Sequence, residues 1–193
     1  PTIRVSDAQR RTRLLRRHGL DGVRGPAAPE QVCRQIVGLH ATTASTVPLA
    51  AWARGAAAEP QALDEALYTR RSLVKQLAMR RTLFVLDRRH LAAAVGAVGG
   101  RVAASERTNL LRDLRRSDGP PHPEEWIEQA GAAVLEVLSG TELSSAEVRA
   151  ALPELDRSVL VGAGKKYGGP SPLLPRVMNL LAARGEIVRG HSN

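Results

Sequence analysis

Residues 73–86 have the sequence LVKQLAMRRTLFVL, in which two apolar runs flank Met79, Arg80 and Arg81. Short runs that are rich in Leu, Val and Phe are typical of β-strands, and the break between them favours a tight turn. The segment therefore predicts a β-hairpin with a basic turn. Helical patterns precede it, and three helices followed by a hairpin is the order of elements in a winged-helix domain.

The segments before the hairpin have the apolar spacing and the end signals of helices. A first helix, capped by Ser6 or Asp7, is predicted to extend to about His18, with arginines over most of its polar side. A second helix opens at Pro29, and small and hydroxyl residues at positions 38–46 then interrupt the pattern. Two further helices are predicted over residues 47–54 and 60–67. The interruption is where we expect the chemistry to lie.

The segments after the hairpin are again mostly helical. Helices are predicted over residues 88–98, 101–116, 124–138, 142–152 and 172–183, with a Gly-rich loop at 162–169 and a strand beginning at 186–189. The run of Pro, Gly and Asp at residues 117–123 predicts a linker between a first domain (1–116) and a second domain (124–193). We therefore expect a mainly α protein with short β-hairpins, built as tandem winged-helix (helix-turn-helix) domains.

The net charge of +9 favours a polyanion as the partner, and double-stranded DNA is the first candidate. Because nearly all of the cations are Arg in a chain rich in Ala and Gly, a GC-rich genome could produce part of this charge, and solvated helix faces are the alternative for each cluster. Aromatic residues make up only 3%, which disfavours a stacking platform for single strands. The expected DNA contacts are Arg10, Arg11, Lys75, Arg80, Arg81, Lys165, Lys166, Tyr167 and Arg176.

Several other kinds of site and location are disfavoured by the sequence. The single Cys33 is expected to be a buried thiol, and the scattered histidines predict neither a metal site nor a cofactor. The loop at 162–169 lacks the residues of a phosphate-binding P-loop. Without a secretory signal or a long apolar run, we expect a cytoplasmic protein with no membrane partner. Trp52 and Trp126 lie in apolar helical patterns and are expected in the core.

The segment from Val37 to Arg54 and the segment from Arg71 to Phe84 resemble a known family, the AlkZ-like winged-helix DNA glycosylases of bacteria. That family has a Gly-hydrophobic-Gln-x-Gln or Gly-hydrophobic-Gln-x-Asp motif, and its two functional positions fall on His40 and Thr42 here. In the second segment the family has Met-Arg-Gly-Thr-Leu-His. In this sequence Arg81 stands in place of that Gly and Phe84 in place of that His. Residues 171–189 are similar to the next helix and wing strand, and the likeness covers the N-terminal half of a typical member.

The resemblance implies excision of alkylated or crosslinked bases by hydrolysis of the N-glycosidic bond. His40 and Thr42 are then the candidate catalytic residues, since a neutral imidazole can hold and deprotonate the attacking water and a hydroxyl can hydrogen-bond it. The alternative is a non-catalytic DNA-binding protein that regulates or protects DNA. The missing initiator Met and the strand predicted at the end of the sequence favour a piece of a longer protein.

Overall fold

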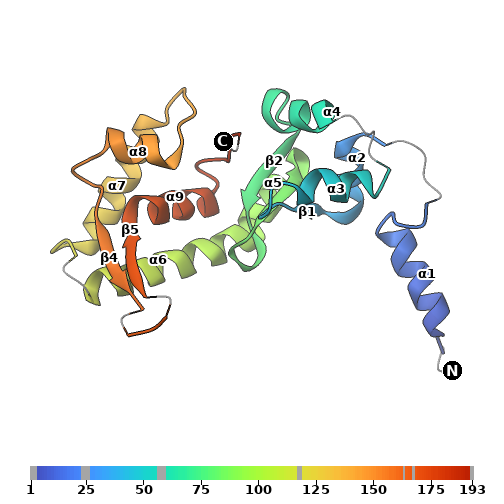
Figure 1. Ribbon diagram of the computed structural model, residues 1–193, viewed down its shortest axis with the longest axis horizontal. Helices are drawn as coiled ribbons and strands as arrows, with labels where there is room; N and C mark the ends of the chain where they lie inside the picture. Colours follow the sequence, from blue (N-terminus) through green and yellow to red (C-terminus); the bar gives the residue numbers. More distant parts are fainter. Residues whose placement is uncertain are drawn as a thin grey trace. The chain divides into compact units, whose positions relative to one another are not determined.

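The computed structural model describes residues 4–22, 27–55, 60–116, 119–162, 164–166 and 168–191. It confirms a mainly α protein with two small antiparallel sheets (Figure 1). The chain divides into two units. Apart from the last two residues, the first unit comprises residues 1–76 and 82–93, and the second comprises residues 77–81 and 94–191.

The first unit combines short helices with a three-stranded sheet. Its elements are α1 (Asp7–Arg17), α2 (Pro29–Ile36), β1 (Gly38–His40), α3 (Thr46–Trp52), α4 (Pro60–Asp64), a π-helical turn (Glu65–Thr69), β2 (Leu73–Leu77), β3 (Leu83–Asp87) and the start of α5 (Arg88–Ala94). The strand order is β1-β3-β2, and β1 is antiparallel to β3, with His40 opposite Phe84. The predicted hairpin of β2 and β3 is therefore confirmed, and β1 extends it at one edge.

The core of the first unit is formed by α2, α3 and the sheet. Val32 and Cys33 of α2, Leu39 of β1 and Val85 of β3 are at most 2% exposed. Cys33 is buried as predicted, and burial raises the pKa of its thiol to about 12, with a smaller contribution from the negative charges nearby. A thiol with this pKa remains protonated at neutral pH and acts as a small apolar group.

The segment after α2 differs from the prediction, because residues 38–40 form a strand where an interruption between helices was expected. Val37 ends α2 with φ +72°, which a β-branched residue rarely adopts, and the chain then turns into β1. A Cβ built at position 38 would lie 2.6 Å from Leu86 Cδ2 and 3.0 Å from the Val85 carbonyl oxygen. Glycine at this position therefore allows β1 to approach β3 closely.

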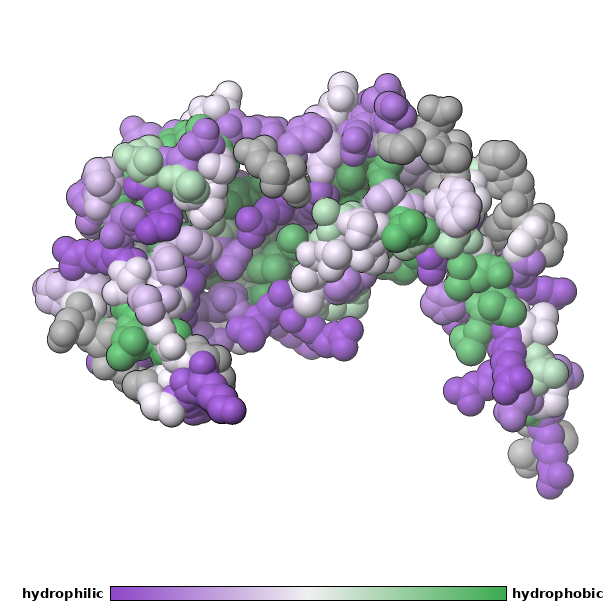
Figure 2. All heavy atoms as spheres, viewed as in Figure 1, coloured by the Kyte–Doolittle hydropathy of each residue, from purple (hydrophilic) through white to green (hydrophobic). Residues whose placement is uncertain are grey.

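Helix α1 begins at Ser6, one of the two caps that the sequence predicts, and Ser6 forms a complete capping box. The Ser6 hydroxyl accepts a hydrogen bond from the Gln9 backbone N–H, and the Gln9 side chain accepts one from the Ser6 backbone N–H. No residue of α1 is buried, and Leu14 and Leu15 are each 46% exposed. Figure 2 shows hydrophilic side chains along most of this helix and an apolar patch toward its C-terminal end.

The second unit is a helical assembly with one hairpin. Its elements are a 3₁₀ turn (Met79–Arg81), a π-helical turn (Val95–Gly99), α6 (Gly100–Arg116), α7 (Pro123–Val137), α8 (Ser145–Ala151), β4 (Ser158–Val161), β5 (Gly169–Pro172) and α9 (Leu173–Arg184). Helix α9 packs against both α6 and α7. Leu110, Ile127, Leu173 and Leu180 are at most 1% exposed, and Trp126 is buried as predicted.

Helix α6 packs with α7 and α9, which follow the predicted linker, and belongs to the same compact unit as these helices. Two expectations for the second unit need correction. Strands β4 and β5 form a hairpin around the Gly-rich loop, and this hairpin precedes α9. Residues 186–189 form no strand, because β5 already pairs with β4 and this segment has no strand beside it in the described part of the chain.

Candidate functional site

The structure brings the two candidate catalytic residues together at the end of β1. Thr42 Oγ1 lies 3.4 Å from His40 Nε2, and both side chains are exposed. The imidazole of His40 contacts the ring of Phe84 on β3 edge-on, with ring centroids 5.3 Å apart and an interplanar angle of 88°. The strand pairing places these two rings opposite each other, so Phe84 supports the orientation of the imidazole.

This geometry can hold a water molecule between an imidazole and a hydroxyl. Two polar atoms 3.4 Å apart can both lie within hydrogen-bond distance of one water on their exposed side. A neutral imidazole accepts a proton from such a water, and the hydroxyl orients it. Phe84 offers no hydrogen bond, so among these three residues the polar chemistry is that of His40 and Thr42.

The predicted cations near the first hairpin differ in their availability. Lys75 is half-buried, donates a hydrogen bond from Nζ to Tyr68 Oη and lies 5.0 Å from the centroid of that ring. Arg71, which has φ +52°, lies with its guanidinium carbon 5.9 Å from the same ring. Lys75 is therefore held against Tyr68 by a hydrogen bond and a cation–π contact, and its ammonium group is less available to bind a phosphate.

The basic turn of the hairpin places Arg80 and Arg81 in consecutive left-handed conformations. Their φ angles are +55° and +59°, a region in which a residue with a Cβ costs of order 1 kcal/mol. The family that this segment resembles has Gly at the position of Arg81, and the backbone conformation found there favours Gly. Arg81 donates a hydrogen bond to Glu106 at 3.0 Å, whereas exposed Arg80 has no ion pair with any described residue.

The predicted cations of the second unit also divide into two kinds. Lys165 and Lys166 are exposed in the loop between β4 and β5. Arg176, one of the expected DNA contacts, has a side chain that is only 18% exposed and donates to Asp113 of α6 at 2.9 Å. This ion pair joins α9 to α6. Tyr167 lies outside the described residues.

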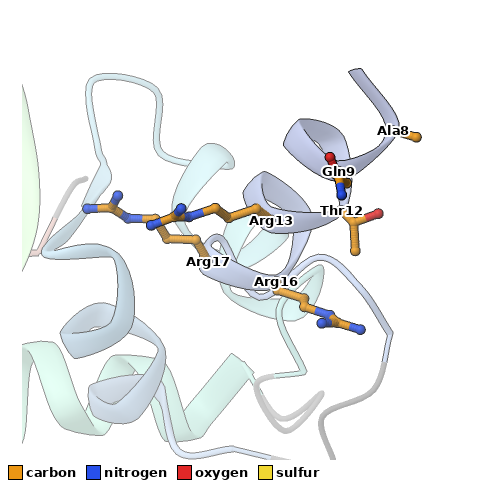
Figure 3. A pocket seen from close by; sticks show the side chains of 6 residues that line it. All are labelled: Ala8, Gln9, Thr12, Arg13, Arg16 and Arg17. Atoms are coloured by element: carbon orange, nitrogen blue, oxygen red, sulfur yellow. The ribbon is translucent and has the colours of Figure 1, made fainter. Parts of the chain in front are cut away.

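Helix α1 presents its arginines to solvent. Arg10 and Arg11 are exposed, and neither has an ion pair with a described residue. An open hollow runs along the helix, and Arg13 and Arg17 extend to the same side while Arg16 extends to another (Figure 3). The residues that line it are Ala8, Gln9, Thr12, Arg13, Arg16 and Arg17. Because one helix supplies all of them, the hollow is a basic surface and does not enclose a small ligand.

The prediction that Trp52 lies in the core is wrong. Trp52, expected in the core, is 65% exposed on α3, and Leu49 beside it is 62% exposed. The helix is apolar on several sides, so its pattern does not distinguish the buried side, which carries Val47 and Ala51, from the outer one. Trp52 thus joins His40 and Thr42 as an exposed residue of the segment 40–52.

Among the described residues, no three or more His, Cys, Asp or Glu side chains are grouped so that they could hold a metal ion. The helices of the described segments also include none that is long and apolar enough to cross a bilayer.

The protein is mainly α with two small sheets, and its segment around His40 resembles the motif of the AlkZ-like DNA glycosylases. The family model of the DNA glycosylase AlkZ-like proteins matches residues 33–193, so the chain belongs to this family. It is similar in fold to the solved structure of Streptomyces sahachiroi DNA glycosylase AlkZ, with a TM-score of 0.61 and 20% identity over 92% of this chain. The chain spans 44% of that structure's length. Among curated proteins, none matches this sequence.

Proposed function

We propose that this protein binds double-stranded DNA through winged-helix units and excises an alkylated or crosslinked base by hydrolysing the N-glycosidic bond. The observation that carries the proposal is the proximity of the His40 and Thr42 side chains at the end of β1 in a chain of this family. Those two residues occupy the functional positions of the motif that the segment resembles. We propose the same domain limits as the sequence predicts, 1–116 and 124–193, as units of binding.

The order of elements in the first unit supports a winged-helix interpretation. Helix α2, strand β1, helices α3 and α4 and then the hairpin of β2 and β3 follow one another, with β1 paired to β3. Winged-helix domains place a helix in the major groove and use the hairpin turn against the backbone. In this interpretation Arg80 of the turn contacts a phosphate, and α1 adds Arg10 and Arg11.

The proposed chemistry suits a cationic base. An N7-alkylated purine carries a positive charge and leaves readily, so the enzyme needs little acid catalysis at the base. The water held at His40 attacks the sugar carbon as the C–N bond breaks, and the imidazole takes the proton of that water. The products are an abasic site and the free base, and the step requires neither a metal nor a cofactor.

An excision assay with the full-length protein tests the proposal. Duplex DNA carrying one N7-methylguanine is incubated with excess protein, and abasic sites are scored by strand cleavage. We expect release that is absent from the same duplex without the lesion. Duplex binding without release from N7-methylguanine or from a bulkier N7 adduct would favour the alternative, a non-catalytic DNA-binding protein that regulates or shields DNA.

The turn arginine gives a prediction for binding alone. Arg80→Ala is expected to weaken binding to duplex DNA and to lower the slope of log Kd against log salt by about 1, since one phosphate contact is lost. Fluorescence anisotropy with a labelled duplex at four salt concentrations measures both quantities.

The matched control for Arg80 is Arg149→Ala, because Arg149 donates to Asp156 at 2.8 Å within the second unit. This control is expected to leave the salt slope unchanged. Equal slopes for wild type and Arg80→Ala would remove Arg80 from the interface.

A further inference from the structure

The exposed apolar face of α3 has no role in the core of the first unit. Val47 and Ala51 are each 2% exposed and fill the inner side of the helix, whereas Leu49 and Trp52 are more than three-fifths exposed. Positions 49 and 52 are three residues apart, so their side chains are neighbours on one helical face. Figure 2 shows a hydrophobic group over α3 on the face in view. The two side chains thus form one apolar patch, the α3 patch.

The α3 patch belongs to the same local structure as the candidate catalytic residues. Helix α3 packs against β1, the strand that ends at His40 (Figure 1). The connection between them carries the exposed hydroxyls of Thr42, Thr43 and Ser45. An aromatic ring on this helix therefore lies in the segment that would meet the lesion, with hydrogen-bond donors for sugar and phosphate between the two.

The charge of the first unit indicates which partner covers the patch. This unit has 14 Lys and Arg residues against seven Asp and Glu, a net charge of +7, so it carries most of the +9 of the whole chain. A surface of this charge attracts a polyanion, whereas the centre of a protein–protein interface is depleted of charged residues. An apolar patch that lies beside exposed hydroxyls, in a unit of this net charge, therefore fits DNA, whose bases have apolar π-faces inside a rim of phosphates.

We infer that the indole of Trp52, with Leu49 beside it, stacks on a base of duplex DNA that is opened at the lesion next to His40. This inference rests on the proposed function and names a positioning residue for it. Apolar side chains inserted at a base step unstack it and hold the DNA in the altered geometry. Enzymes that act on bases use stacking of this kind to hold a base outside the duplex.

The chain contains two tryptophans, which makes the inference measurable. Trp126 is buried at 7% exposure. Trp126→Phe leaves Trp52 as the one indole among residues 1–193. In the full-length Trp126→Phe protein, provided any further tryptophans are also replaced by Phe, we expect acrylamide to quench Trp52 when DNA is absent. Binding of an N7-methylguanine duplex should quench the Trp52 emission itself and protect it from acrylamide.

Affinity measurements on full-length variants with Trp126 intact complete the test. Trp52→Ala should raise Kd for the lesion duplex by roughly 5- to 100-fold, as for loss of a base–aromatic stack, without changing the salt slope. Trp52→Phe should stay within about 3-fold of wild type because its ring still stacks. Leu160→Ala is the control, since Leu160 is also 62% exposed but lies on β4 in the second unit.

The outcomes separate this inference from the proposed function. Tight duplex binding with unchanged Trp52 emission and an unchanged Kd for Trp52→Ala would overturn the stacking role and leave DNA binding intact. Shielding of Trp52 from acrylamide in the free protein would show that another part of the protein covers the patch, which also overturns it. Absence of duplex binding by the wild type would overturn both proposals.

Discussion

His40→Ala is expected to lower the single-turnover rate of base excision by roughly 10²- to 10⁴-fold, which is the usual contribution of a positioned general base. The variant removes the imidazole that accepts the proton of the attacking water but keeps the backbone of β1. Because His40 is exposed and contacts Phe84 only at a ring edge, its loss should leave the fold intact. Duplex affinity measured by anisotropy should change by less than about 3-fold.

Two hydroxyl variants provide the controls for His40. Thr42→Ala removes the hydroxyl that lies 3.4 Å from Nε2, and we expect a smaller loss because the base remains. Thr108→Ala, which removes an exposed hydroxyl of α6 in the second unit, should keep the wild-type rate. The double variant His40→Gln/Thr42→Gln places the residues of the resembling motif at both positions and should retain measurable excision. If His40→Ala excised the base at the wild-type rate, the catalytic assignment would be wrong.

Much of the fold follows from local signals that can be recognised in the sequence. The cap at Ser6, the Pro at the start of α2 and the two apolar runs around Arg80 each determine an element boundary, and the structure confirms them. The hydrogen bonds that such signals provide lie within a few residues of one another. They can therefore be predicted without knowledge of the tertiary structure.

The elements that were missed depend on distant partners. Strand β1 has only three residues and exists because Gly38 allows it to approach β3, more than forty residues later. Similarly, β4 and β5 stabilise each other across the Gly-rich loop, and β5, with the sequence Gly-Pro-Ser-Pro, contains no residue that favours a strand. Short strands of this kind are determined by pairing and not by their composition.

Part of the candidate site could also be predicted, and part could not. The sequence shows which residues are cationic, but it does not show that Arg176 is held by Asp113 and Lys75 by Tyr68. Such contacts between elements form only after packing brings the partners together. Trp52 was assigned to the core because apolar residues surround it in sequence, whereas the core needs only one side of α3. The proximity of His40 to Thr42 follows directly from their two-residue spacing.

Asp87→Ala is expected to lower the free energy of unfolding by about 2–3 kcal/mol at neutral pH. Asp87 is 2% exposed at the end of β3, where Oδ1 accepts from the Arg89 backbone N–H and Oδ2 accepts from Arg34, both at 2.9 Å. The variant loses the hydrogen bond at the start of α5 and the ion pair to α2. The cost stays below that of a fully buried pair because the Arg34 side chain is 36% exposed and can hydrate. Urea unfolding followed by circular dichroism measures the difference.

Two further variants separate the contributions of Asp87. Asp87→Asn keeps an oxygen for the Arg89 N–H but removes the charge, so its cost should be smaller than that of Asp87→Ala. Asp64→Ala, an exposed carboxylate on α4, is the control and should change the free energy of unfolding by less than about 0.5 kcal/mol. A destabilisation by Asp87→Ala no larger than this control would show that the carboxylate does not stabilise the junction of α2, β3 and α5.

The stabilisation by Asp87 should disappear in acid. Burial alone would raise the pKa of this carboxyl, but the Arg89 backbone N–H and the positive charges of Arg34 and Arg89 hold the pKa below its ordinary value. A carboxyl whose pKa is lower in the folded protein stabilises it above the unfolded pKa of about 3.9, and this stabilisation is lost as the pH falls through the folded pKa. The difference between wild type and Asp87→Asn should therefore be constant from pH 5 to 7 and shrink below about pH 4. A difference that grew on acidification would mean that Asp87 is protonated more readily in the folded protein, contrary to its contacts.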